Sequence, residues 1–173
     1  ENWKGPHSIH RGSSGPLKIN QSESTWPIVD AWVEAAQKEG FKYNDDYNSG
    51  DQEGVGFFQQ TADKGLRCSA SKAYLKPIRQ RKNLKIFTHT LVKKIILKDR
   101  KAIGVLTEKG STEKYLLAKK EIILSAGSIG SPQLLMVSGI GNAKELKQHG
   151  IDVKIDLKGV GKNLQDHLQA RPV

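Results

Sequence analysis

The sequence contains almost none of the residues that build disulfide frameworks or multi-thiolate metal sites. Its 173 residues include one cysteine, Cys68, which excludes an internal disulfide and any zinc or iron–sulfur site that needs several thiolates. A lone cysteine is also compatible with a reducing compartment. No apolar run reaches the ~18–20 residues of a membrane-spanning helix. We therefore expect no integral membrane segment and a cytoplasmic protein, with peripheral membrane association left open.

Aromatic residues are scarce, at 6%, whereas positive charge is abundant. There are 28 Lys and Arg residues against 18 Asp and Glu, a formal net charge of +10, which raises the hypothesis of nucleic-acid binding. The basic residues are scattered, however, and the densest run, residues 76–85, has no interleaved aromatics to stack on bases. We interpret the lysines as solvated surface and expect no nucleic-acid partner. A non-enzymatic basic binding module remains as a second class of function.

Familiar catalytic and metal-binding arrangements are also missing. Among five histidines, only His7 and His10 lie close together, and we expect that pair to be a surface feature rather than a metal site. His167, beside Asp166, is expected to be a buried, hydrogen-bonded histidine, with an oriented imidazole as the alternative. Cys68 is expected to be a packing residue. Neither a Rossmann G-x-G-x-x-G nor a phosphate-binding G-x-x-x-x-G-K-[ST] loop occurs.

The first half of the sequence predicts one substantial helix among irregular segments. Ser24 or Thr25 can cap it, Pro27 suits its first turn and Gly40 can close it. Its apolar residues recur at spacings of four, which is typical of an amphipathic scaffold helix. The other expected elements are a short strand at residues 17–20, a long ordered loop or a set of short strands at 42–66, and a short helix at 69–74 that ends before Pro77.

The second half predicts a sheet followed by two helices. We expect strands at residues 84–88, 91–97, 102–107, 113–118, 121–125 and 151–157. The middle strands resemble a β-meander, and the continuous apolar run Ile-Ile-Leu at residues 122–124 is typical of a strand buried on both faces. A helix should begin at Ser131 as cap and Pro132 as first residue. A second helix should run from Asn142 to Gly150.

The junction between the buried strand and the first of these helices is the main candidate site. Small residues at 125–130, Ser-Ala-Gly-Ser-Ile-Gly, allow a ligand to approach the backbone closely. The N-terminus of a helix also favours a phosphate or nucleotide. The same kind of turn often only packs a helix against a sheet, so the residues alone leave a structural and a functional interpretation open.

Residues 127–141 read Gly-Ser-Ile-Gly-Ser-Pro-Gln-Leu-Leu-Met-Val-Ser-Gly-Ile-Gly. This segment resembles the second signature of the glucose–methanol–choline (GMC) oxidoreductases, with every defined position filled. Further segments resemble the middle region of that family in order: residues 15–17, 51–56, 65–69, 73–77, 81–84, 102–105, 159–161 and 163–167. The resemblance covers essentially the whole chain. It is strongest to the choline dehydrogenase and FAD-dependent alcohol dehydrogenase branch.

The resemblance implies an enzyme that oxidises an alcohol, choline or another primary alcohol, by hydride transfer to FAD. It places Val92 at the adenine, which would be read by backbone groups, and the turn Ser125, Ala126 and Gly127 beside the ADP portion. Ser131, at the helix start, completes the expected cofactor-binding set. No residue matches the family's catalytic histidine, so no catalytic residue and no metal ligand are expected. The acceptor, and an oxidase as the alternative to a dehydrogenase, stay open.

The resemblance also implies a fold class and a domain organisation. We expect a mixed α/β (α+β) fold that combines part of a GMC-type FAD-binding domain, with its β-meander, and part of the substrate-binding domain. Residues 1–82 should belong mainly to the substrate side, residues 83–161 mainly to the FAD side, and residues 162–173 should start the return to the substrate domain. The family's N-terminal pyrophosphate-binding motif has no counterpart here. We therefore expect the chain to be an internal segment of a longer protein.

Overall fold

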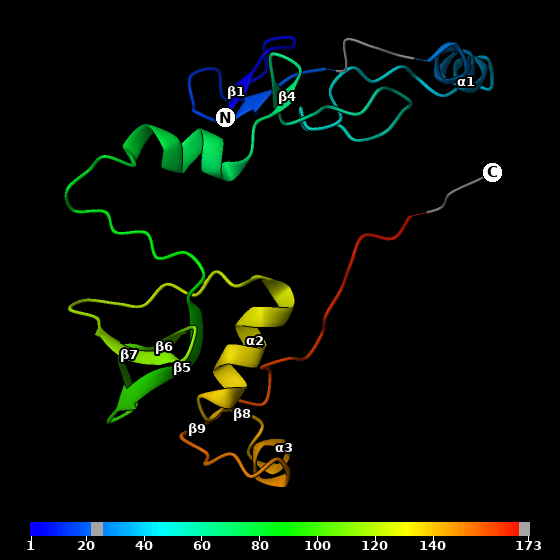
Figure 1. Ribbon diagram of the computed structural model, residues 1–173. Helices are drawn as coiled ribbons and strands as arrows, with labels where there is room; N and C mark the ends of the chain where they lie inside the picture. The colour runs from blue at the N-terminus through cyan, green and yellow to red at the C-terminus, as the bar shows by residue number, and fades with distance from the viewer. Residues whose placement is uncertain (22–25, 170–173) are drawn as a thin grey trace. The chain divides into compact units, whose positions relative to one another are not determined.

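The computed structural model describes residues 1–21 and 26–169 of the chain. It divides into two compact units, Glu1–Lys85 and Ile86–Val173, which appear in Figure 1 as the blue-to-green and green-to-red parts of the chain. Both contain helices and strands, so the fold is of mixed α/β class, as the sequence predicts. Within the described residues, no helix has the length and apolar character needed to cross a membrane.

The first unit is built from short elements. They are the parallel pair β1 (Asn2–Trp3) and β2 (Lys18–Ile19), helix α1 (Pro27–Lys38), the antiparallel pair β3 (Ala62–Asp63) and β4 (Leu66–Arg67), a π-helical turn η1 (Ser71–Leu75) and a 3-10 turn η2 (Lys76–Ile78). The short helix expected to end before Pro77 instead continues through it as η2. A proline is tolerated there because the first turn of a helix has no partner for its N–H.

Helix α1 forms where the apolar spacing predicts it. Pro27 occupies its first position, with Trp26 in extended conformation as N-cap, while the capping residues expected from the sequence, Ser24 and Thr25, lie outside the described residues. Val33 is buried, but Trp32 is 60% exposed. The helix therefore buries only part of its apolar surface within the described residues of this unit.

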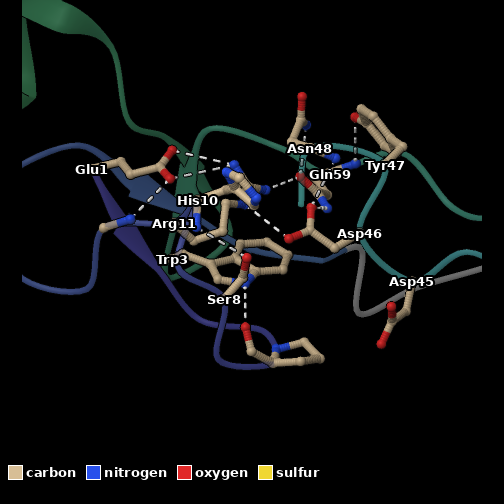
Figure 2. Close-up of polar contacts among 12 residues, drawn as sticks. Glu1, Trp3, Ser8, His10, Arg11, Asp45, Asp46, Tyr47, Asn48 and Gln59 are labelled. Atoms are coloured by element: carbon tan, nitrogen blue, oxygen red, sulfur yellow. Dashed lines mark hydrogen bonds and ion pairs between the residues drawn. The ribbon is translucent and has the colours of Figure 1, made fainter. Parts of the chain in front are cut away.

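A charged cluster lies inside the first unit (Figure 2). The Arg11 side chain, 6% exposed, donates from Nε to Asp46 Oδ2 at 3.0 Å and lies over the Trp3 ring at 4.3 Å from its centroid. Gln59 donates from Nε2 to Asp46 Oδ1 at 2.7 Å and accepts from Arg11. The cluster joins segments far apart in the sequence, including the loop expected at residues 42–66, so that loop is held in place by specific contacts.

Two opposing effects act on the pKa of Asp46. Burial raises the pKa because it disfavours the charged carboxylate. The hydrogen bonds from Gln59, from the backbone N–H of Asn48 and from Arg11, together with the charge of Arg11, outweigh burial and lower the pKa below its ordinary value. Asp46 is therefore ionised in the folded protein at neutral pH.

The second unit contains the predicted β-meander. Strands β5 (Leu91–Lys98), β6 (Lys101–Lys109) and β7 (Thr112–Leu117) pair antiparallel in that order. Helix α2 (Gly127–Val137) packs against β5 (Figure 1). It is followed by β8 (Ile140–Gly141), helix α3 (Ala143–Gln148) and β9 (Ile155–Asp156), which pairs parallel with β8. Asn142 caps α3 by accepting from the N–H groups of Lys144 and Glu145, as predicted.

Three of the predicted strands are wrong or too long. Residues 84–88 and 121–125 form no strand, and residues 151–157 contain only β9. The segment expected to be buried on both faces has Ile123 80% exposed. An apolar run predicts burial, but a strand also needs a partner for its backbone groups, and no described strand pairs with residues 121–125.

Candidate functional site

A cleft of about 740 Å³ lies between the start of β5, the segment before α2 and one face of α2. It is lined by Thr90, Leu91, Val92, Lys93, Ile123, Leu124, Ser125, Ala126, Gly130, Gln133, Leu134 and Val137. Val92, Ser125 and Ala126, which are separated in the sequence, thus share one cleft. Gly127 and Ser131 do not line it, but they belong to the turn and helix that form its wall.

The hydrogen-bonding direction of Val92 follows from the register of the sheet. Ala118 N–H donates to Ile103 O at 2.9 Å, so the backbone groups of Ile103 point toward β7. The N–H and C=O groups of successive residues point alternately to the two sides of a strand. Because β6 pairs with β7 without irregularity, the N–H and C=O of Thr107 also point toward β7. Val92 lies opposite Thr107. The N–H and C=O of Val92 therefore point away from β6, to the free edge of β5.

A register shift near Lys93 produces this arrangement. Val92 pairs with Thr107 and Lys94 with Leu106, so β5 contains one extra residue at this point. An extra residue of this kind is a β-bulge, which reverses the alternation beyond it. Without it, Lys93 would present its backbone groups at the edge in place of Val92.

The turn before α2 has the conformation that a glycine permits. Gly127 has φ of +84°, and no atom lies within 4 Å of the position that a Cβ would occupy. Positive φ is readily adopted by glycine because it has no Cβ. The Cα of Gly127 therefore faces open space, into which a ligand can approach the backbone.

The predicted start of the helix is wrong by more than one turn. Helix α2 begins at Gly127, with Ala126 as N-cap, so Ser131 and Pro132 lie inside it. The Oγ atom of Ser131 instead accepts a hydrogen bond from Ala126 N–H at 3.1 Å. Ser131 thus reaches back to satisfy one of the N–H groups that a helix start leaves without a partner. It positions the turn from within the helix rather than from its cap.

The far end of α2 is fixed by the Ser-Gly-Ile-Gly segment of the signature. Ser138 is buried and bonds to β5, whereas Gly139, with φ of +87°, passes so close to Asp152 that a Cβ would lie 2.4 Å from its carbonyl oxygen. Ile140 is buried in β8, and Gly141 lies against Met136 and Leu146. Ser138, Gly139 and Ile140 thus have a packing reason for their identity, whereas a Cβ at Gly141 would make only ordinary contacts.

The charged side chain at the cleft already has partners. Lys93 forms ion pairs with Glu108 at 2.7 Å and Glu113 at 2.6 Å. The hydrogen bonds to these two carboxylates, Glu108 first, raise the pKa of Lys93 above its ordinary value. The groups that the cleft offers to a ligand are therefore mainly backbone edges and apolar side chains.

The remaining candidates from the sequence lie elsewhere. His7 and His10 are exposed, and Cys68 is buried, accepting from Lys18 N–H at 3.5 Å. His167 is exposed, so its prediction as a buried histidine is wrong; the chain that follows Asn163 is too open to cover it. In residues 1–21 and 26–169, no group of three or more His, Cys, Asp or Glu side chains is arranged to hold a metal ion.

Sequence reasoning missed several residues of the cleft. Gly130, from the small-residue segment, lines it together with Gln133 and Val137 of α2, which the sequence did not suggest. Their spacing of three and four residues puts them on one helix face, a signal that becomes useful once the helix is known to begin at Gly127. A second cavity, of about 840 Å³, lies between α2, residues 149–151 and residues 161–165, and contains none of the predicted site residues.

Comparison with known proteins identifies relatives along nearly the whole chain. The family model for GMC oxidoreductase matches residues 2–169. The oxygen-dependent choline dehydrogenases of Brucella ovis and Photobacterium profundum are 46% and 44% identical to the chain, each over 98% of it. The chain spans only 31% and 30% of those proteins, which is about a third of their length.

Solved structures show the same relationship. The pyridoxine 4-oxidase from Mesorbium loti matches with a TM-score of 0.86 and 34% identity, over 90% of this chain and 31% of that one. An FAD-dependent oxidoreductase from Chaetomium thermophilum matches with a TM-score of 0.85 and 36% identity, over 90% of this chain and 28% of that one. With the family model covering almost every residue, the chain belongs to the GMC oxidoreductase family.

Proposed function

We propose that this chain is the central part of a longer FAD-dependent alcohol oxidoreductase, which transfers a hydride from the CH–OH carbon of an alcohol to the flavin. Membership in the GMC family supports this function. The cofactor site is assigned from the cleft between β5 and α2. The free N–H and C=O of Val92 line this cleft, and the Gly127 turn, with open space at its Cα, lies at the start of the helix that forms its wall. When bound, FAD supplies the hydride-accepting chemistry.

The residues of the cleft and of the turn beside it have complementary tasks toward the adenine end of FAD. The N–H and C=O of Val92 can donate to and accept from the adenine ring, whatever the side chain is. Ser125, Ala126 and Gly127 let the ADP portion approach the backbone, and Ser131 holds Ala126 in place through its hydrogen bond. The apolar wall made by Leu91, Leu124 and α2 excludes water from one face of the ligand.

Choline, or another primary alcohol, is the proposed substrate, because the choline dehydrogenases share the highest identities quoted above. The structural relatives include oxidases, so transfer of electrons to oxygen is the alternative to a separate acceptor. The proposed protein is cytoplasmic. In this proposal the described part of the chain contributes cofactor-binding groups, and membership in an oxidoreductase family displaces the hypothesis of a basic binding module.

The backbone assignment at Val92 is tested with two substitutions in the full-length protein. Val92→Ala keeps the N–H and shortens the side chain, whereas Val92→Pro removes the N–H donor. Because that N–H points away from β6, a proline there deletes no ladder hydrogen bond. We expect near-normal flavin occupancy in Val92→Ala and a strong loss in Val92→Pro, measured as the flavin-to-protein absorbance ratio of the purified proteins.

Thermal unfolding of the apoproteins provides the control, because it shows whether Val92→Pro has simply damaged the sheet. Full flavin occupancy in a folded Val92→Pro protein would contradict the adenine contact. Absence of flavin in the wild-type protein, together with no flavin reduction by any alcohol, would contradict the proposed function as a whole.

A further inference from the structure

Ser138 makes the bond between α2 and β5 next to the cleft. It is 1% exposed and lies directly after Val137, which lines the cleft. Its Oγ atom accepts from Ile95 N–H at 2.8 Å and donates to Leu134 O at 2.6 Å. One hydroxyl thus uses both its donor and its acceptor capacity, and it joins residues 43 positions apart in the sequence.

The partner of Ser138 belongs to the same edge as the proposed adenine contact. Ile95 donates to Ser138 and not to β6, so its backbone groups point to the free edge of β5, as those of Val92 do. Of the N–H groups at these two edge positions, that of Ile95 donates to Ser138, and that of Val92 stays free. The hydroxyl therefore marks where the cleft ends along β5.

We propose that Ser138 is a positioning residue for the adenine end of the cofactor: it ties the C-terminal end of α2 to the edge of β5 and so sets the spacing of the two cleft walls. This inference rests on the proposed function of the cleft as an FAD site. Ser138 touches no cleft volume itself and acts through Ile95 and Leu134.

The surrounding contacts explain why the hydroxyl can be removed without losing the helix. Ser138 N–H bonds to Leu134 O and Leu135 O, and Gly139 O accepts from the N–H groups of Lys154 and Ile155. These backbone bonds persist when the side chain is changed. Ser138→Ala would leave α2 formed but release its tie to β5, with the buried N–H of Ile95 left without a partner.

The test uses the full-length apoprotein reconstituted with FAD. Ser138→Ala is compared with Thr107→Val, which removes another buried hydroxyl whose bond, to Lys114 O at 2.9 Å, joins β6 to β7 instead of β5 to α2. We expect Ser138→Ala to weaken FAD binding by up to roughly tenfold, the most that the loss of one positioning hydrogen bond can transmit to the site. We expect Thr107→Val to leave FAD affinity unchanged at a comparable loss of thermal stability.

Two further readouts separate positioning from general destabilisation. Hydrogen exchange at the Ile95 amide should accelerate selectively in Ser138→Ala. The affinity for ADP, measured by its competition with FAD rebinding, should fall by the same factor as the affinity for FAD, because both ligands share the adenine end. Should the alanine protein fail to fold, Ser138→Cys, which keeps a weak donor and acceptor, is judged by the same comparison.

Unchanged FAD affinity in Ser138→Ala, or an equal loss in Thr107→Val, would overturn the positioning role while the FAD site stands. Wild-type protein that binds neither FAD nor ADP would instead overturn the proposed function on which the inference rests.

Discussion

Gly127 provides a sharp test of the cofactor site, because a side chain there meets nothing in the protein itself. Its φ of +84° is a conformation that alanine adopts with a cost of about 1–2 kcal/mol. No atom lies within 4 Å of the added Cβ, so the described residues contribute no steric clash. Any larger effect on FAD binding must come from the ligand, or from a backbone displaced beside it.

Gly110 is a matched control for this substitution. It has φ of +60° and also has no atom within 4 Å of the position that a Cβ would occupy, but it lies in the turn between β6 and β7 and does not line the cleft. Gly127→Ala and Gly110→Ala should therefore lose similar stability, about 1–2 kcal/mol each. Only Gly127→Ala should also lose FAD affinity, by tenfold or more, where tenfold corresponds to about 1.4 kcal/mol.

The assay combines the flavin-to-protein absorbance ratio with FAD titration of the apoproteins and urea unfolding of both variants. Gly127→Val, whose side chain is bulkier and β-branched, should lose bound FAD and alcohol oxidation together. Full flavin occupancy in Gly127→Val would exclude a cofactor contact at this turn. It would mean that the turn only packs the helix, and the assignment of Ser125, Ala126 and Gly127 would have to be withdrawn.

Other predictions concern single interactions in each unit. Ser131→Ala should lower stability by about 0.5–1.5 kcal/mol in urea unfolding, since Ala126 N–H loses its partner but is exposed enough to bond to water. Arg11→Gln should destabilise by about 3 kcal/mol in the same measurement, because it leaves the buried Asp46 carboxylate without its cation. The pKa of Asp46 is lowered in the folded protein, so its ionised carboxylate adds to the free energy of unfolding above the pKa of the unfolded chain, and this contribution is lost as the pH falls below about 3.9. Asp46→Asn should therefore flatten the acid limb of a curve of unfolding free energy against pH. The isolated 173-residue chain should show exposed apolar surface by dye binding and weak FAD affinity, because Trp32 and Ile123 are exposed in its units; a sharp cooperative melt with stoichiometric flavin would contradict this.

The family, the β-meander and the bounds of α1 and α3 could be predicted from local patterns in the sequence. These features are local: strand alternation, turn residues, the Asn142 cap and the proline at the start of α1 act over a few residues. The signature at residues 127–141 is likewise a contiguous pattern. It predicts the turn and the helix that follows it, but not the residue at which that helix begins.

Which groups face the cleft depends instead on contacts between segments that are distant in the sequence. The direction of the Val92 backbone depends on a bulge near Lys93 and on pairing across three strands, which no single segment encodes. The role of Ser138 needs Ile95, 43 residues away. The apolar run at residues 121–125 gave the wrong expectation for the same reason: burial of a strand is a property of its neighbours, and hydrophobicity alone does not supply the partner for its backbone.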